Sequence, residues 1–190
     1  MVADKLHRRI VNAWCMYDWA NSAFATTIMA AVLPTFYSSV AAAGLELHIA
    51  TAYWGYTSSI ALLIAAVLAP TLGALADLLG AKKRFLAVFA ILGIFFTSLL
   101  VLVSKGDWLL ASVLYVLGEI GFSGSIVFYD SLLPHVAKPE DIDYVSSKGY
   151  AMGYLGGGIL LAVNIAMILF WDKLGLGSAE MASRWSFLSV

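Results

Sequence analysis

The sequence predicts an all-α membrane protein, a polytopic bundle of transmembrane helices. Of its 190 residues, 62% are hydrophobic and 12% are charged, whereas ordinary soluble domains have roughly 45–50% and 25%. The mean hydropathy is +0.89. Sixteen glycines and six tryptophans fit membrane helices, in which glycine packs neighbouring helices and tryptophan lies at the interfaces. These observations exclude a water-soluble globule, and the lipid bilayer is the first expected partner.

The charge balance and the cysteine count exclude further classes. Eleven Lys and Arg residues oppose twelve Asp and Glu residues, a formal net charge of −1. Nucleic-acid binding needs a basic excess, so no nucleic-acid partner is expected. Cys15 is the single cysteine and supports neither an internal disulfide nor a thiolate metal cluster. The sequence has no G-x-x-x-x-G-K-[ST] loop, so ATP is not the expected energy source, which leaves an ion or proton gradient or simple facilitation. We expect no metal and no cofactor.

Five apolar segments are long enough to cross a bilayer, which takes about 20 residues for a hydrocarbon core of about 30 Å. They cover residues 12–40, 50–76, 85–103, 108–129 and 150–171. The first contains Asp18, Asn21 and Pro34 and is longer than the apolar part of a signal peptide, so it is expected to remain attached. A sixth apolar stretch, residues 185–190, rises only about 9 Å as a helix and is expected to begin a sixth span.

Positive charges are distributed unevenly between the connections, which predicts the orientation. Eight of the eleven Lys and Arg residues lie in the N-terminal tail and after the second and fourth spans, and three lie on the opposite side. By the positive-inside rule, the N-terminus and the even-numbered connections are cytoplasmic. Aromatic residues are expected at the interfaces: Trp14, Tyr17 and Trp19 at the inner one, and Tyr53, Trp54, Trp108 and Trp171 at the outer one.

The connection after the second span carries a tight turn with an acid before it and bases after it. Gly80 permits the backbone to reverse within a few residues, and Gly73 lets another helix approach closely. Asp77 can meet a basic residue or a helix N-terminus and so close this face of the bundle. An ordinary positively charged cytoplasmic loop has the same charges. The bases of this candidate cytoplasmic gate are Lys82, Lys83 and Arg84.

Several segments resemble known families. The turn is similar to the loop signature of the major facilitator superfamily, G-x-L-A-D-x-x-G-x-K, which joins helices two and three on the cytoplasmic side. The matching residues are Gly73, Leu75, Ala76, Asp77, Gly80 and Lys82, whereas Leu78 and Ala81 stand where the signature has basic residues. Three further segments resemble the vacuole-effluxer-like family of that superfamily. They are residues 17–24, 128–135 and 149–158.

The resemblance implies a transporter of about twelve helices, in two related halves that rock around a site near the middle of the membrane. Residues 1–190 then correspond to the N-terminal transmembrane half-domain, and the partner is the C-terminal half of the same transporter. Fungal members are associated with amino-acid efflux from the vacuole, so a small-molecule solute such as an amino acid is the expected cargo. The expected location is the bacterial inner membrane, or the vacuolar membrane for a fungal protein.

Polar residues inside the first span are the first candidates for function. An ionisable side chain at membrane depth costs several kcal/mol and usually faces a bundle interior or a water-filled cavity. Asp18 lies about two turns into the span, and Asn21 and Ser22 follow at i+3 and i+4, so the three are expected to share one helix face. We expect Asp18 and Asn21 to line the central cavity, where the superfamily places its first helix.

The fourth span carries a second polar stripe. Glu119, Ser123 and Asp130 align because eleven residues return within about 20° of the starting direction. Glu119 is expected near the middle of the membrane, protonated or paired with a base from helices outside this chain. Asp130 is expected about 16 Å away towards the cytoplasm, as a cavity residue or as an interfacial carboxylate. Together with Asp18, these carboxylates are the expected contacts for a proton or for a substrate amine.

Glycines in the fifth span have the spacing of a helix-packing motif. Gly149, Gly153 and Gly157 repeat every four residues, which lets a neighbouring helix come close. No proline follows them as in the antiporter signature of the superfamily, so antiport is not inferred. Asn164 is expected to form an interhelical hydrogen bond or to contact the cavity.

Two other classes of function fit parts of the sequence. One segment of the fourth span matches G-x-S-G, the serine motif of rhomboid intramembrane proteases. It consists of Gly121, Phe122, Ser123 and Gly124. A serine nucleophile needs a base within hydrogen-bond reach, but His7, His48 and His135 lie in the tail or the loops. Helix packing explains these glycines better, so no enzyme is expected. The remaining alternative is a half-size protein that pairs with a second copy as a channel or carrier.

Overall fold

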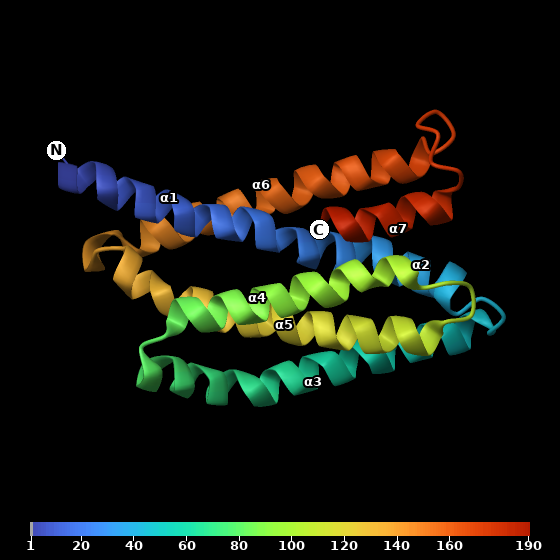
Figure 1. Ribbon diagram of the computed structural model, residues 1–190, viewed down its shortest axis with the longest axis horizontal. Helices are drawn as coiled ribbons and strands as arrows, with labels where there is room; N and C mark the ends of the chain where they lie inside the picture. Colours follow the sequence, from blue (N-terminus) through green and yellow to red (C-terminus); the bar gives the residue numbers. More distant parts are fainter. Residues whose placement is uncertain (1) are drawn as a thin grey trace.

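The protein is an elongated bundle of helices in a computed structural model that describes the backbone of residues 2–190 and the side chains of residues 5–75, 77–78 and 80–190. Five helical segments of the described chain are long and apolar enough to cross a membrane. They run side by side along the long axis of the molecule (Figure 1). This arrangement confirms the all-α membrane fold that the composition predicts.

The first span is a continuous helical run with two π-helical segments. It consists of α1 (Val2–Ala23), η1 (Phe24–Ala31), α2 (Val32–Phe36) and η2 (Tyr37–Ala41). The Val32 N–H donates to the Thr27 carbonyl, five residues back, as a π turn requires. Pro34 follows directly, and its ring would clash with the carbonyl four residues earlier in a regular helix. The wider turns before Pro34 relieve that clash.

The second and third spans are joined by the tight turn. Helix α3 (Leu47–Leu79) ends at Gly80, which adopts the left-handed conformation with φ 59° and ψ 12°, as glycine does at many helix ends. Helix α4 (Lys82–Leu99) begins two residues later and ends in the short η3 (Leu100–Leu102). A residue with a side chain at position 80 would be strained in this conformation.

Helix α5 (Trp108–Val136) lies at the centre of the bundle and packs against α1, α3 and α4. A β-carbon on Gly121 would meet the backbone of Gly93, so α4 and α5 touch backbone to backbone there. Near the start of α5, Ser112 Oγ lies 2.8 Å from both the Tyr37 hydroxyl and Thr57 Oγ1. These contacts hold α3, α4 and the first span around one central helix.

Helix α6 (Ile142–Leu169) follows the short η4 (Pro139–Asp141) and runs along α1. Helix α7 (Ala179–Ser189) begins earlier than position 185, where the apolar residues start. Its first turn is stabilised by polar contacts: Ser178 Oγ accepts the Met181 N–H at 3.0 Å, and Arg184 pairs with Glu180 at 2.8 Å. Helix α7 folds back along α6, and the chain ends near the middle of the bundle (Figure 1).

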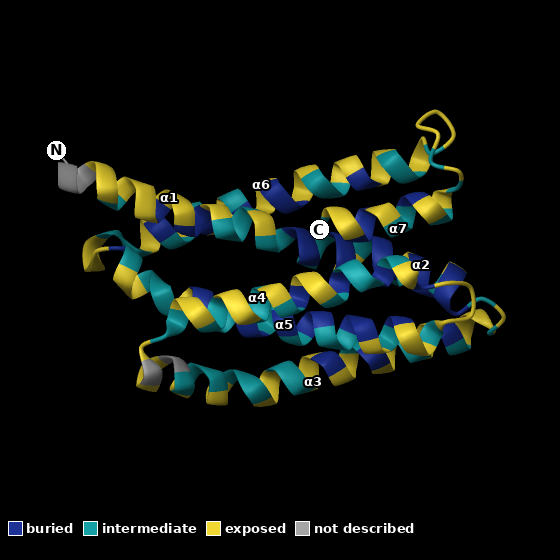
Figure 2. Cartoon of the chain, in the orientation of Figure 1, coloured by how far each residue is buried: buried dark blue, intermediate teal, exposed yellow. Residues whose placement is uncertain are grey.

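The N-terminus, the α3–α4 turn and the α5–α6 connection lie at the same end of the bundle (Figure 1). Buried residues gather where the helices touch, and the outer faces of α3, α4 and α6 carry many exposed residues (Figure 2). Large apolar side chains are among them, including Tyr56, Leu63 and Val67 of α3. Apolar outer faces of this kind suit the hydrocarbon of a bilayer, so the chain is an integral membrane protein.

Candidate functional site

Helices α1, α5 and α6 line a partly open cavity of about 540 Å³ to which both predicted aspartates contribute. Asp18 comes from α1 and Asp130 from α5. Its volume lies within the range of about 300–1,000 Å³ that small-molecule sites occupy. We call it the Asp18–Asp130 cavity. Its other polar lining residues are Trp14, Ser22, Thr26, Tyr129, Ser146, Tyr150 and Tyr154.

Polar side chains of the first span form one stripe along the cavity. Asp18, Ser22 and Thr26 follow each other at intervals of four residues, which places them on one helix face. Ser22 Oγ donates to Asp18 Oδ1 at 3.3 Å, and Thr26 Oγ1 donates to the Gly157 carbonyl at 3.1 Å. The stripe is therefore anchored to α6 at one end and carries a carboxylate at the other.

An aromatic stack forms part of the cavity wall between α1 and α5. The rings of Trp14 and Tyr129 are stacked with centroids 4.3 Å apart, and Tyr17 stacks on Tyr129 at 5.1 Å. Trp14 Nε1 also donates to the Tyr129 carbonyl at 3.2 Å. Trp14 was expected at the inner membrane interface, and in the structure its side chain is buried between the helices. The four-residue spacing from Trp14 to Asp18 is the pattern that could have assigned it to the cavity.

The predicted packing glycines of α6 lie against the cavity face of α1. A β-carbon on Gly149 would come within 2.5 Å of the Trp14 ring, and one on Gly157 within 2.9 Å of the Ser22 carbonyl oxygen. Gly153 lies between them and faces Asp18. Close approach of the two backbones thus sets the shape of the cavity wall.

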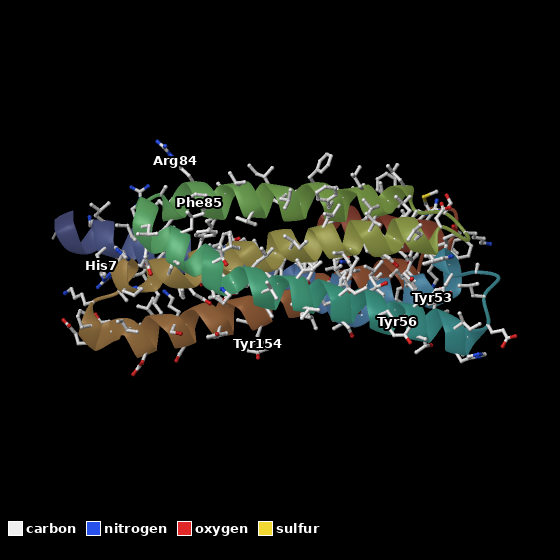
Figure 3. The ribbon with its side chains drawn as sticks, turned by 90° about the horizontal axis from the view of Figure 1, so that it is seen from below. His7, Tyr53, Tyr56, Arg84, Phe85 and Tyr154 are labelled. Carbon is white, nitrogen blue, oxygen red and sulfur yellow. The ribbon has the colours of Figure 1, made fainter. Side chains whose placement is uncertain are left out.

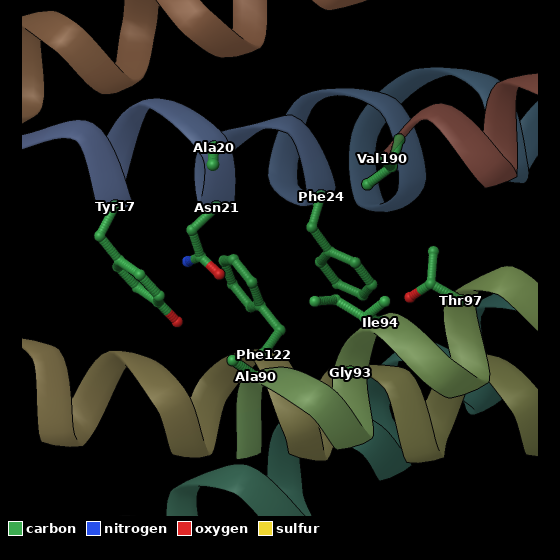
Figure 4. Close-up of a pocket in the computed structure, with 10 residues that line it drawn as sticks. All are labelled: Tyr17, Ala20, Asn21, Phe24, Ala90, Gly93, Ile94, Thr97, Phe122 and Val190. Carbon is green, nitrogen blue, oxygen red and sulfur yellow. The ribbon is translucent and has the colours of Figure 1, made fainter. Parts of the chain in front are cut away.

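Asn21 does not share the face of Asp18 and Ser22. It lines a smaller space of about 120 Å³ with Tyr17, Phe24 and Phe122, between α1 and helices α4 and α5 (Figure 4). Three residues advance a helix by about 300° and four by about 400°, so Asn21 and Ser22 point about 100° apart. The expectation of a single polar face was therefore wrong for Asn21.

Glu119 lies outside the Asp18–Asp130 cavity, in the interior of the bundle. Its side chain is 1% exposed, Ser123 Oγ donates to Oε1 at 2.8 Å, and Oε2 has no hydrogen-bond partner among the described residues. Between Glu119 and Asp130 the first span covers α5, where Phe24 stacks on Phe122 at 4.7 Å. The two carboxylates of α5 therefore lie in separate environments.

The α3–α4 turn is tied to α5 by one lysine. Lys82 Nζ lies 3.2 Å from Asp77 Oδ1 and donates to the Ser131 carbonyl at 3.1 Å. The Lys82 side chain is 15% exposed and that of Asp77 is 77% exposed. Lys83 is exposed, and Arg84 projects away from the bundle (Figure 3). Lys82 is thus the base that fastens the turn.

One glycine of the loop signature, Gly73, makes no close contact with the described residues. A β-carbon on Gly73 would meet no described atom within 4 Å, so the close helix approach expected at Gly73 is not made within this part of the chain. Gly73 lies on a face of α3 that the described residues leave uncovered. The side chain of Ala76 lies outside the described residues.

The G-x-S-G segment is occupied by packing contacts. Gly121 and Gly124 face Gly93 and the Phe89 ring of α4 so closely that neither position has room for a β-carbon. Ser123 Oγ donates its hydrogen bond to Glu119. Helix packing therefore accounts for both glycines of the segment.

Comparison with known proteins identifies the family. The model of the vacuole effluxer Atg22-like family matches residues 43–190. An uncharacterised MFS-type transporter of Bacillus subtilis, YxiO, is 42% identical over 178 residues, which cover 93% of this chain and 42% of that protein. Autophagy-related protein 22 of Coccidioides immitis is 36% identical over 97 residues, 51% of this chain and 16% of the fungal protein.

A protein of Aquifex aeolicus is 29% identical over 162 residues, 85% of this chain and 38% of that protein. No solved structure matches the chain. The chain spans less than half the length of the curated relatives it matches. The family model nevertheless covers most of the chain, and the bacterial relative matches nearly all of it. The chain belongs to the vacuole effluxer Atg22-like family, within the major facilitator superfamily.

Proposed function

We propose that this chain forms the N-terminal half of a transmembrane transporter that moves small solutes by alternating access. The observation that carries the proposal is the Asp18–Asp130 cavity, in which two helices contribute one carboxylate each to a space of small-molecule size. The transporter name of the Bacillus subtilis relative supports the same function. The Asp18–Asp130 cavity is this half's share of the solute site, and the C-terminal half supplies the opposite wall.

The charge distribution supports a cytoplasmic N-terminus. The N-terminus, the α3–α4 turn and the α5–α6 connection share one end of the bundle (Figure 1), and eight of the eleven Lys and Arg residues lie on these segments or next to them. By the positive-inside rule this end faces the cytoplasm. The Lys82 contacts then form part of a cytoplasmic gate. The membrane is the bacterial inner membrane, or the vacuolar membrane in a fungus.

The energy source we propose is an ion or proton gradient. Glu119 is the proton-coupling candidate, because its carboxyl group lies inside the membrane-spanning bundle with one oxygen unpartnered among the described residues. Amino acids and related small solutes are the first cargo to test, because the resemblance to the vacuole-effluxer-like family implies them and the model of that family matches the chain.

Reconstitution tests the proposal. The complete gene product is purified, inserted into proteoliposomes and assayed for uptake and counterflow with a panel of radiolabelled amino acids and amines. Asp18→Asn and Asp130→Asn are expected to lower uptake at least about tenfold. Asp143→Asn, on an exposed position at the start of α6, is the matched control. Uptake that survives both cavity substitutions would remove the cavity from the transport path.

A further inference from the structure

We propose that the Asp18–Asp130 cavity selects solutes that carry a positive charge, with an ammonium group held between the two carboxylates, over zwitterionic and neutral solutes of the same shape. The inference rests on the proposed transport function, because it takes this cavity as the solute site. It concerns the chemical class of the solute, which the fold and the family leave open.

The charge of the lining is the first argument. Among the described lining residues, Asp18 and Asp130 are acidic and none is Lys, Arg or His. Asp18 accepts one bond from the Ser22 hydroxyl, and Asp130 makes no side-chain hydrogen bond or ion pair with the described residues. Asp18 is half-buried in the first span, where a carboxylate is costly unless a counter-charge meets it, whereas Asp130 is exposed. A bound cation supplies that counter-charge to both.

The hydroxyl of Tyr129 is a second, independent observation. Tyr129 is 4% exposed and lines the cavity, yet its buried hydroxyl oxygen has no hydrogen-bond partner among the described residues. A buried polar group left without a partner costs free energy. A phenolic oxygen accepts hydrogen bonds, and an ammonium group has three N–H donors. The Tyr129 oxygen is closed to solvent in this structure, so an ammonium in the cavity bonds it only where the neighbouring side chains move aside to admit it.

Aromatic rings form the rest of the recognition surface. Trp14 and Tyr129 stack at one side of the cavity, and Tyr150 and Tyr154 line it from α6. Tyr154 projects outward from its helix (Figure 3). Aromatic faces attract cations through the ring quadrupole and also bury apolar groups. The lining thus favours an organic cation with an apolar or aromatic body over a bare metal ion.

The same lining disfavours a zwitterion. The α-carboxylate of an amino acid would enter a space whose described ionisable groups at short range are two aspartates and tyrosines. Like charges repel, and the repulsion is stronger where side chains exclude water, as around the half-buried Asp18, than beside the exposed Asp130. An amine without the carboxylate keeps the favourable contacts and loses the repulsion, and a neutral alcohol of the same shape loses the contacts with the carboxylates.

Binding of three matched probes tests the inference. The probes are 2-phenylethylammonium, phenylalanine and 2-phenylethanol, which share a phenyl body and differ in charge. Affinity for the purified complete gene product is measured by isothermal titration calorimetry in detergent. We expect the amine to bind at least about tenfold more tightly than phenylalanine, and 2-phenylethanol to bind most weakly.

Variants assign the binding to the cavity. Asp18→Asn and Asp130→Asn are each expected to weaken binding of the amine about tenfold, and Tyr129→Phe about threefold. Tyr129→Phe keeps the stacked ring, so it tests the hydroxyl even if an aspartate variant does not fold. Asp143→Asn is expected to bind the amine as the wild type does. Size-exclusion profiles establish that each variant is folded before it is titrated.

Two outcomes would overturn the inference. The first is phenylalanine binding as tightly as the amine, and the second is amine binding that Asp18→Asn, Asp130→Asn and Tyr129→Phe all leave unchanged. Flux in proteoliposomes separates this failure from failure of the proposed function. Flux of a zwitterion without preference for the amine would contradict the proposed charge selectivity and would still support the transport function. Amine binding of the expected pattern without any flux would support the proposed cation site and contradict the proposed transport function.

Discussion

Gly153 of α6 lies directly against Asp18 of α1. A β-carbon at position 153 would come within 3.0 Å of the Asp18 carboxylate oxygen Oδ2 and within 2.5 Å of Ser22 Oγ. Such distances are shorter than ordinary van der Waals contact, so any side chain at position 153 must move Asp18 or Ser22. Because Gly153 has no side chain, the Asp18 carboxylate that we assign to solute binding can lie directly against α6.

Gly153→Ala is expected to displace the Asp18 carboxylate and lower solute uptake about tenfold. The added methyl group also overpacks the α1–α6 contact, which costs about 1–3 kcal/mol of stability. Uptake in proteoliposomes and thermal unfolding followed by tryptophan fluorescence measure the two effects.

Gly158 provides the control for that substitution. It lies on the same helix, and a β-carbon there would meet nothing within 4 Å. Gly158→Ala is expected to leave uptake unchanged and to keep or raise stability, because alanine favours a helix over glycine by about 1 kcal/mol. Equal uptake by the two alanine variants would show that Gly153 does not position Asp18.

The α4–α5 contact predicts a larger loss of stability at Gly121. A β-carbon on Gly121 would meet the Gly93 backbone, and a backbone cannot swing aside as a side chain can. Gly121→Ala is expected to cost at least about 3 kcal/mol, the upper part of the usual range for overpacking. Gly55→Ala, which has open space on α3, is the control. Wild-type thermal stability of Gly121→Ala in detergent would contradict the backbone contact.

The α3–α4 turn predicts a graded effect of three substitutions. Lys82 is largely buried and bonds both Asp77 and the Ser131 carbonyl, so Lys82→Met should cost about 1–3 kcal/mol. Asp77→Asn should cost less than about 1 kcal/mol, because the Asp77 carboxylate is exposed and its ion pair is screened. Lys83→Met should have no measurable effect, since Lys83 is exposed. Melting temperatures of the three variants in detergent test this order, and a smaller loss for Lys82→Met than for Asp77→Asn would contradict it.

Long apolar runs made the membrane fold predictable from the sequence. In lipid, every backbone polar group must be bonded within the segment, so an apolar run of span length has to be helical. The π turns of η1 were not predicted, because they follow from local backbone geometry near Pro34. The early start of α7 was also missed, although Ser178 before Glu180 is a helix-start pattern. Hydropathy alone does not report such capping.

The candidate site could be predicted in part. Asp18 and Asp130 were expected to face a cavity because carboxylates in spans usually do, with an interfacial carboxylate as the alternative for Asp130. Asn21 was assigned to the face of Asp18 because positions i+3 and i+4 were taken as one face, although these two positions point about 100° apart. Tyr129 was missed altogether. Nothing in the sequence shows that a tyrosine hydroxyl will be buried without a partner, since that depends on which helices pack around it.

Glu119 yields the prediction that bears on energy coupling. Glutamine has nearly the shape of glutamate, and its amide oxygen can accept the hydrogen bond that Ser123 Oγ now donates to Oε1. Glu119→Gln is therefore expected to fold with a stability within about 1 kcal/mol of the wild type. An amide does not bind and release a proton at physiological pH, so accumulation driven by a pH gradient should be lost, whereas counterflow, which needs no gradient, should continue. Glu140→Gln, at an exposed position outside the spans, should retain both activities. Gradient-driven accumulation by Glu119→Gln at the wild-type rate would mean that the coupling proton is carried elsewhere, with Asp18 and Asp130 the next groups to substitute, because they line the space through which the solute passes.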